Sequence, residues 1–277
     1  MFDRLTRSWE LVKASAAVLS SDRQLLWFPV MSLLASLVVL ASFLLPIFGL
    51  GLLPRDGTSS AVLWVVGFLF YLSQYFVIFF FGSALVGAAM IRLDGGEPTV
   101  QEGLEIAWSK MGVILGYAAI AATVGVLLRA LEERAGFLGR IVIGLLGAAW
   151  TVATFLTVPV LVARDVGPVD AVKESMGLLR KTWGENLAGQ GGIGLAFGLL
   201  SMGVFLVGVG VTLLASTVSG ALAVTVGVAF VVAMLGLGIY QSALTGVYSA
   251  ALYQYASSGE AAQEFQGRLL QEAFQPK

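Results

Sequence analysis

The side chains that most often carry out covalent or metal chemistry are scarce in this sequence. It contains no Cys and no His, which excludes disulfides, thiol chemistry and Cys/His zinc sites. Two acidic pairs remain: Asp94 with Glu97 in a glycine-containing turn, and Glu132 with Glu133 between two arginines. Enzymes that act on lipid headgroups through metal ions need more carboxylates than this, at fixed helical spacing. We therefore expect no catalytic residue, no metal, no cofactor and no enzymatic activity.

Two glycine motifs resemble ligand-binding sequences in their letters only. Residues 189–194 read Gly-Gln-Gly-Gly-Ile-Gly, but no strand precedes them and no acidic residue lies about 20 positions further on, as a dinucleotide site requires. Residues 207–210 read Val-Gly-Val-Gly, but no pore helix precedes them, as a potassium filter requires. Small residues in apolar helices favour close helix packing instead.

Uncharged polar side chains inside the apolar runs are the remaining candidates for a site. They are Tyr71, Gln74, Tyr75, Gln190 and Gln241. One interpretation is that they form hydrogen bonds between helices, each contributing about 0.6–1 kcal/mol. The other is that they line a path for a polar substrate or a lipid.

The composition indicates the kind of element that must position these groups. Hydrophobic residues make up 58% of the 277 residues and charged residues only 12%, against about 25% charged in soluble domains. A helix needs about 20 apolar residues to cross the hydrocarbon layer. The fold class predicted is an all-α, polytopic transmembrane helical bundle, built as one domain. Its six spans are predicted at about residues 25–53, 61–91, 111–128, 138–163, 187–214 and 221–250.

The last two spans come from one uncharged run, residues 187–259, which is 73 residues long. As a single helix it would extend roughly 110 Å, so it must fold back. The small polar cluster at 215–220 predicts the turn.

Short amphipathic stretches precede the odd-numbered spans, and a further one follows the last span. Together they predict helices at about residues 3–21, 99–110, 168–182 and 258–274. The first and third share Val-Lys-x-Ser and a Leu four residues later, which suggests a three-fold repeat of one helix followed by a helical hairpin. Residues predicted to contact lipid at the interface are Trp9, Lys13, Trp108, Lys110, Lys173 and Trp183. The alternative is that these faces pack on the bundle.

The distribution of basic residues predicts the orientation. Twelve of the 16 Lys and Arg residues fall on the side that holds both termini, and four fall on the other. By the positive-inside rule both termini are cytoplasmic, and we expect a multi-pass protein of the plasma (inner) membrane. The formal net charge of −1 gives no reason to expect a nucleic-acid partner.

The opening Met1-Phe2-Asp3-Arg4-Leu5-Thr6-Arg7-Ser8-Trp9-Glu10-Leu11-Val12-Lys13-Ala14-Ser15, continuing to Pro29, resembles a family. It is an uncharacterised prokaryotic family of six-span integral membrane proteins, known only as a domain of unknown function. The layout is also similar to the membrane region of some glycerophosphodiester phosphodiesterases, whose catalytic barrel this chain lacks. The resemblance implies a fold and a location, and it brings no functional residues.

Three hypotheses of function follow. The first is a non-enzymatic scaffold or accessory protein that binds membrane lipids, a partner subunit or a second copy of itself. The alternative is a transporter or channel for an uncharged or amphiphilic solute. The third, a lipid-modifying enzyme, has the least support because the carboxylates are so few. A cavity that reaches the bilayer midplane would favour transport, whereas a packed bundle with a lateral groove would favour binding.

Overall fold

The computed structural model describes residues 13–49, 60–181 and 183–258. These parts are helices joined by short turns, with no strand among them, which confirms the all-α fold class. The elements are 3-10 helix η1 (Arg23–Leu26) and helices α2 (Trp27–Gly49), α3 (Ser60–Leu93), α4 (Val100–Ser109), α5 (Met111–Arg134), α6 (Phe137–Ala153), α7 (Thr157–Ala163), α8 (Pro168–Lys181), α9 (Trp183–Val218) and α10 (Gly220–Ser258). A further helical segment, 13–21, precedes η1.

Six helices in the described part are long and apolar enough to cross a membrane, as in a multi-pass membrane protein. They cover Arg23–Pro46, Trp64–Leu93, Met111–Arg134, Phe137–Ala163, Phe197–Val218 and Gly220–Ser258. The final hairpin turns at Ser219, inside the small polar cluster 215–220, where the Ser219 hydroxyl accepts a hydrogen bond from the N–H of Leu222 (3.1 Å). The predicted residues 3–12 and 259–274 of the amphipathic helices lie outside the described residues.

The helices form three similar units, each with a short helix followed by a hairpin of two long ones. The units are 13–21 with α2 and α3, α4 with α5 and α6–α7, and α8 with α9 and α10. The second long helices of the three hairpins, α3, α7 and α10, pack against one another at the centre. Gly246 allows close approach there, because a Cβ at this position would lie 2.3 Å from Leu85 Cδ2 of α3.

Each short element also packs on the last long helix of another unit. Helix α4 packs on α3, α8 packs on α7, and η1, which follows 13–21, packs on α10. Aligning the three short helices on Val12, Val100 and Val172 places Ser15, Gly103 and Ser175 at one position, and all three of these small residues are buried. A Cβ on Gly103 would lie 2.9 Å from the carbonyl oxygen of Ala84 in α3. A small residue at this position therefore lets the short helix approach a neighbouring backbone.

Helix α6 is interrupted before α7, within the fourth predicted span. Pro159 has no N–H to donate to the carbonyl of Phe155, and its ring clashes with that carbonyl in a regular helix. The backbone tightens there, with bonds from Phe155 N to Val152 O (3.1 Å) and from Thr157 N to Thr154 O (3.0 Å). This leaves the N–H of Leu156 and the carbonyl of Ala153 without helical partners, and Ser175 of α8 bonds both.

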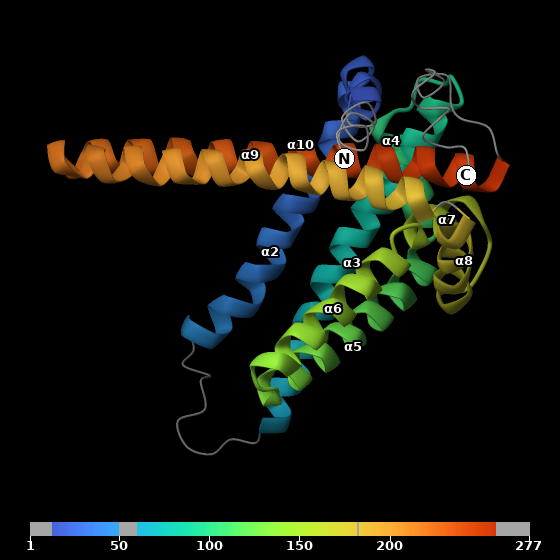
Figure 1. Cartoon of the computed structure of the whole chain (residues 1–277), viewed down its shortest axis with the longest axis horizontal. Coiled ribbons are helices and arrows are strands. Elements are labelled where there is room, and N and C mark those ends of the chain that lie inside the picture. The colour runs from blue at the N-terminus through green and yellow to red at the C-terminus, as the bar shows by residue number, and fades with distance from the viewer. Residues whose placement is uncertain (1–12, 50–59, 182, 259–277) are drawn as a thin grey trace.

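The three hairpins converge at one end of the molecule and diverge from it (Figure 1). The α9–α10 hairpin crosses the others and extends well beyond them. The buried residues gather at the converging end, around Phe28, Ile114, Leu156 and Tyr248, whereas the diverging parts expose large apolar side chains. By the Lys/Arg distribution, the converging end is the one predicted to face the cytoplasm.

Candidate functional site

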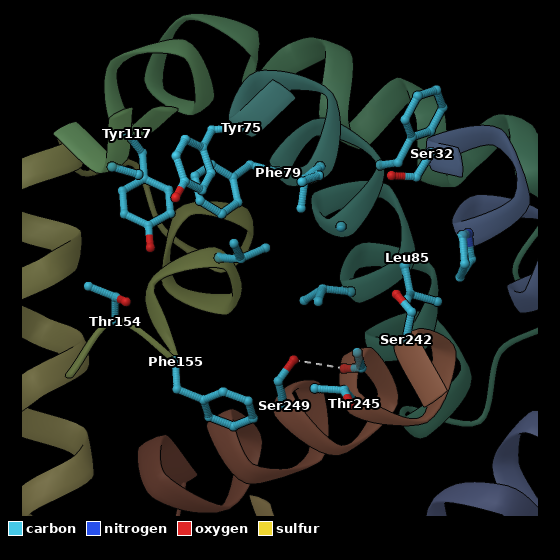
Figure 2. A pocket seen from close by; sticks show the side chains of 18 of the residues that line it. Ser32, Tyr75, Phe79, Leu85, Tyr117, Thr154, Phe155, Ser242, Thr245 and Ser249 are labelled. Carbon is cyan, nitrogen blue, oxygen red and sulfur yellow. Dashed lines mark hydrogen bonds between the residues drawn. The ribbon is translucent and has the colours of Figure 1, made fainter. Parts of the chain in front are cut away.

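A cavity of 380 Å³ lies where the three hairpins converge (Figure 2). Its walls come from α2, α3, α5, α6–α7 and α10, so every unit contributes to it. The lining residues are Phe28, Pro29, Ser32, Tyr75, Ile78, Phe79, Phe81, Gly82, Leu85, Val86, Tyr117, Ala121, Trp150, Thr151, Thr154, Phe155, Val158, Ser242, Thr245, Gly246 and Ser249. Helices α3, α6 and α10 each begin at the tip of a hairpin. On each of them the lining residues with lower numbers therefore lie nearer the tip, and those with higher numbers lie nearer the converging end.

The cavity is closed at the converging end and open toward the diverging hairpins. Leu85, Val86 and Ser249 lie at the closed end and are at most 6% exposed. Thr151, Ser242 and Ile78 lie nearer the tips of their hairpins and are exposed, Ile78 by 47%. Because Ile78 sits near the middle of α3, the mouth opens about halfway along this candidate membrane span.

Eight hydroxyl groups belong to the lining residues, and several of them are already hydrogen-bonded within their own helix. Thr151 donates to Gly147 O (3.0 Å) and Thr154 to Trp150 O (2.8 Å). On α10, Thr245 donates to Gln241 O (2.9 Å) and Ser249 to Gly246 O (2.8 Å). The hydroxyl oxygens of Thr151, Thr245 and Ser249 keep free lone pairs that can accept hydrogen bonds from a ligand, and that of Thr154 also interacts with the hydroxyl of Tyr117.

Stacked aromatic rings form one wall and continue along α3 toward the hairpin tip. The ring centroids are 4.4 Å apart for Phe79 and Tyr117, 5.7 Å for Tyr75 and Phe79, and 6.3 Å for Tyr71 and Tyr75. At the far end, Arg129 donates to the hydroxyl of Tyr71 (2.9 Å). Figure 2 shows Tyr75, Phe79 and Tyr117 on the side of the cavity opposite the hydroxyls of α10. The cavity therefore has a flat aromatic wall facing a hydroxyl-bearing one.

The lining residues include no Asp, Glu, Lys or Arg. Among the described residues, no group of three acidic side chains is placed to hold a metal ion. The arrangement can hold an uncharged group through stacking, apolar contact and hydrogen bonds. The lining holds Ser, Thr and Tyr hydroxyls but no His, Asp, Glu or Lys beside them that could activate one as a nucleophile.

The predicted intramembrane polar residues divide between the cavity and the helix contacts. Tyr75 lines the cavity, and Tyr71 continues its aromatic wall. Gln74 donates to the carbonyl of Ser36 in α2 (3.1 Å), which is an interhelical hydrogen bond. Gln241 is half-buried on α10, and its carbonyl accepts the bond from Thr245. Gln190 lies in α9, and its side chain is outside the described part.

The Ser and Thr residues that line the cavity were not predicted from the sequence, although their spacing indicates a shared helix face. Ser242, Thr245 and Ser249 are spaced i, i+3 and i+7, so they lie on one face of α10. Thr151 and Thr154 repeat the i, i+3 spacing on α6. Hydroxyls aligned on one face of an otherwise apolar helix predict a polar contact on that face.

The tryptophans predicted to lie at the interface are only partly described. Trp108 is 69% exposed on α4, with its ring edge-on to Phe80 (6.1 Å). Trp9 lies outside the described residues, and of Trp183 only the backbone, the first residue of α9, is described. The exposure of Trp108 is the arrangement that an interfacial ring needs.

The predicted lysines differ in what they contact. Lys110 connects the junction of α4 and α5 to the turn after α7, because its ammonium forms an ion pair with Asp165 and donates to the carbonyl of Arg164 (3.2 Å). The hydrogen bond and the charge of Lys110 lower the pKa of Asp165. Lys173 forms an exposed ion pair with Asp170 (3.0 Å) on α8, and Lys13 is exposed. Lys110 thus binds protein groups, and the two others lie on the surface.

A family model matches residues 61–263, and it is described as a family of unknown function, DUF6159. The match covers most of the chain, so the chain belongs to this family. No curated protein matches the sequence.

Proposed function

We propose that this DUF6159 protein is a non-enzymatic, lipid-binding protein of the membrane that takes part of a lipid molecule into its central cavity. The observation that supports this most is the cavity itself, which is uncharged, partly aromatic and open toward the diverging, apolar hairpins. Its volume of 380 Å³ lies within the range of about 300–1,000 Å³ typical of small-molecule sites.

The surroundings of the mouth suit the chains of a lipid. Large apolar side chains beyond the mouth are exposed on α2 and α10, among them Leu34, Val38, Val231 and Leu235. Acyl chains that leave the cavity would therefore meet surfaces as apolar as the bilayer. Only the polar end of the lipid and the first part of its chains need to fit inside.

The proposal includes residence in the plasma membrane with both termini in the cytoplasm. The Lys and Arg bias supports this orientation, since twelve of the 16 basic residues fall on one side of the six spans. In this orientation the closed end of the cavity faces the cytoplasm, and its mouth faces the middle of the bilayer.

Transport of an uncharged amphiphile is the second candidate. It is favoured by one observation, that the cavity is open at one end and closed at the other while lying between three similar units. Alternating access needs such a one-sided site between repeats that can move against each other.

Lipid binding can be tested with one pair of matched variants on α10. Thr245 and Thr225 both donate to the carbonyl four residues earlier, at 2.9 and 3.0 Å, but only Thr245 lines the cavity. Thr245→Phe fills the cavity, and Thr225→Phe adds the same ring to an exposed face. Each variant is purified in mild detergent, and the retained lipid is quantified by mass spectrometry.

We expect Thr245→Phe to lower the lipid retained per protein at least fivefold and Thr225→Phe to leave it unchanged. Ser242→Leu at the mouth provides a second filling variant in case Thr245→Phe does not fold. Equal lipid content in all folded variants would refute the proposal. Reconstitution in liposomes with a fluorescent uncharged lipid separates the two candidates, because only a transporter speeds its movement between leaflets.

A further inference from the structure

We propose that the cavity selects an uncharged lipid with a free hydroxyl group, of the diacylglycerol or lipid-alcohol class, over phospholipids. The inference rests on the lipid binding proposed above, and it specifies the polar end of the ligand. It follows from the charge of the lining, the direction of its hydrogen bonds and the position of its polar groups.

The charge of the lining disfavours a phosphate. No Lys or Arg is among the lining residues, and an ionised group moved from water into such a site without a partner loses much of its solvation energy. The nearest cation along the aromatic wall, Arg129, is held at the far end by Tyr71, three ring contacts away from Tyr117. An anionic headgroup would therefore be buried without a counter-charge.

Four of the eight lining hydroxyls favour a ligand group that donates a hydrogen bond, whereas those of Ser32, Tyr75 and Ser242 have no such bond to a carbonyl of the described residues and can donate as well as accept. The hydroxyl protons of Thr151, Thr154, Thr245 and Ser249 are all given to carbonyls of their own helices. What these side chains present to a ligand is oxygen lone pairs, which accept. A phosphodiester has only acceptors, whereas a hydroxyl group has one proton to donate and can also accept.

The polar groups lie where the end of a lipid would arrive. Ser249 and Thr154 are 6% and 8% exposed and belong to opposite walls near the closed end. Figure 2 shows both on either side of Phe155, with Thr245 next along α10 toward the mouth. A lipid whose hydroxyl group lies near Ser249 would direct its acyl chains past Ser242 and Ile78 into the bilayer.

The test uses one lipid that lacks the proton donor and one that carries a phosphodiester in its place. The protein is reconstituted in nanodiscs with diacylglycerol, with its O-methyl ether, or with phosphatidylmethanol, each carrying bromine on its acyl chains. Bromine quenches tryptophan at close range, and Trp150 lines the cavity. The part of the signal that is lost in Trp150→Phe belongs to this site.

We expect diacylglycerol to quench Trp150 with an affinity at least tenfold higher than either of the other lipids. Ser249→Ala removes one acceptor with little change in volume, and it should lower the affinity for diacylglycerol severalfold while leaving that for the ether unchanged. Ser257→Ala is the matched control, because Ser257 also donates to a carbonyl three residues earlier but is exposed outside the cavity.

The outcomes separate this inference from the proposed function. If diacylglycerol and its ether bind equally, or phosphatidylmethanol binds best, and Thr245→Phe still abolishes quenching, the class of ligand proposed here is wrong and lipid binding stands. If no brominated lipid quenches Trp150 and the filling variant retains all of its lipid, both proposals fail.

Discussion

Replacing Ser175 by Ala should destabilise the protein in a way that the equivalent replacement at Ser15 does not. Both serines are buried and hold the same position in their short helices. The Ser175 hydroxyl accepts from the N–H of Leu156 (3.1 Å) and donates to the carbonyl of Ala153 (2.8 Å). The Ser15 hydroxyl has no hydrogen-bond partner in the part of the chain that the structure describes.

The expected magnitude follows from the groups that Ser175→Ala leaves behind. A buried backbone N–H without a partner costs about 1–3 kcal/mol, and a lost hydrogen bond costs about 0.5–1.5 kcal/mol net. Removing an unpaired hydroxyl at Ser15 carries neither cost. We therefore expect Ser175→Ala to lower the free energy of unfolding by about 2 kcal/mol and Ser15→Ala to leave it unchanged or raise it slightly.

The assay is thermal unfolding of the detergent-solubilised protein, followed by circular dichroism. A difference of about 2 kcal/mol corresponds to a Tm lower by roughly 4–8 °C for a chain of this size. The helical signal before unfolding serves as the control for folding of each variant. Equal Tm values for Ser15→Ala and Ser175→Ala would show that Ser175 does not support the break between α6 and α7.

Two further predictions concern packing and orientation. Gly103→Ala should lower the free energy of unfolding by about 1–3 kcal/mol, because the new Cβ would lie 2.9 Å from the carbonyl oxygen of Ala84. Gly112→Ala is the control, because a Cβ at Gly112 meets open space. Similar Tm values for the two variants would contradict the close packing of α4 on α3. Since the chain has no Cys, single cysteines at the exposed positions Ser109 and Ser216 can report which of the two faces the outside of intact cells. We expect an impermeant maleimide to reach Ser216→Cys only, and labelling of Ser109→Cys from outside would reverse the topology.

Much of the fold could be predicted because membrane helices depend on local sequence. Each span must satisfy its backbone hydrogen bonds internally, so an uncharged run of sufficient length identifies a helix without knowledge of its neighbours. The turn at Ser219 was likewise set by local residues, the small polar cluster 215–220. The interruption before α7 had a local cause in Pro159, but its partner Ser175 lies in another helix, and no pattern within the span indicates it.

The candidate site could be predicted only in part, because it depends on which helices meet. Tyr75 stood out as a polar residue in an apolar run, yet Gln74 beside it faces α2 and bonds Ser36. One residue of rotation along a helix, about 100°, separates these two roles. Thr154 and Ser249 come from different units and become neighbours of one cavity only through the contacts of α3, α7 and α10.

The docking of η1 on α10 has a consequence for how the chain is made. A ribosome adds about 5–20 residues per second, so roughly 10–40 s pass between the synthesis of η1 and that of the helix that covers it. During that interval the apolar side chain of Leu25 in η1, buried in the finished protein, has no α10 beside it. We expect the amino-terminal helix to rest on the membrane surface during this time, acting first as a tether for the growing chain and only at the end as the piece that closes the ring of three units.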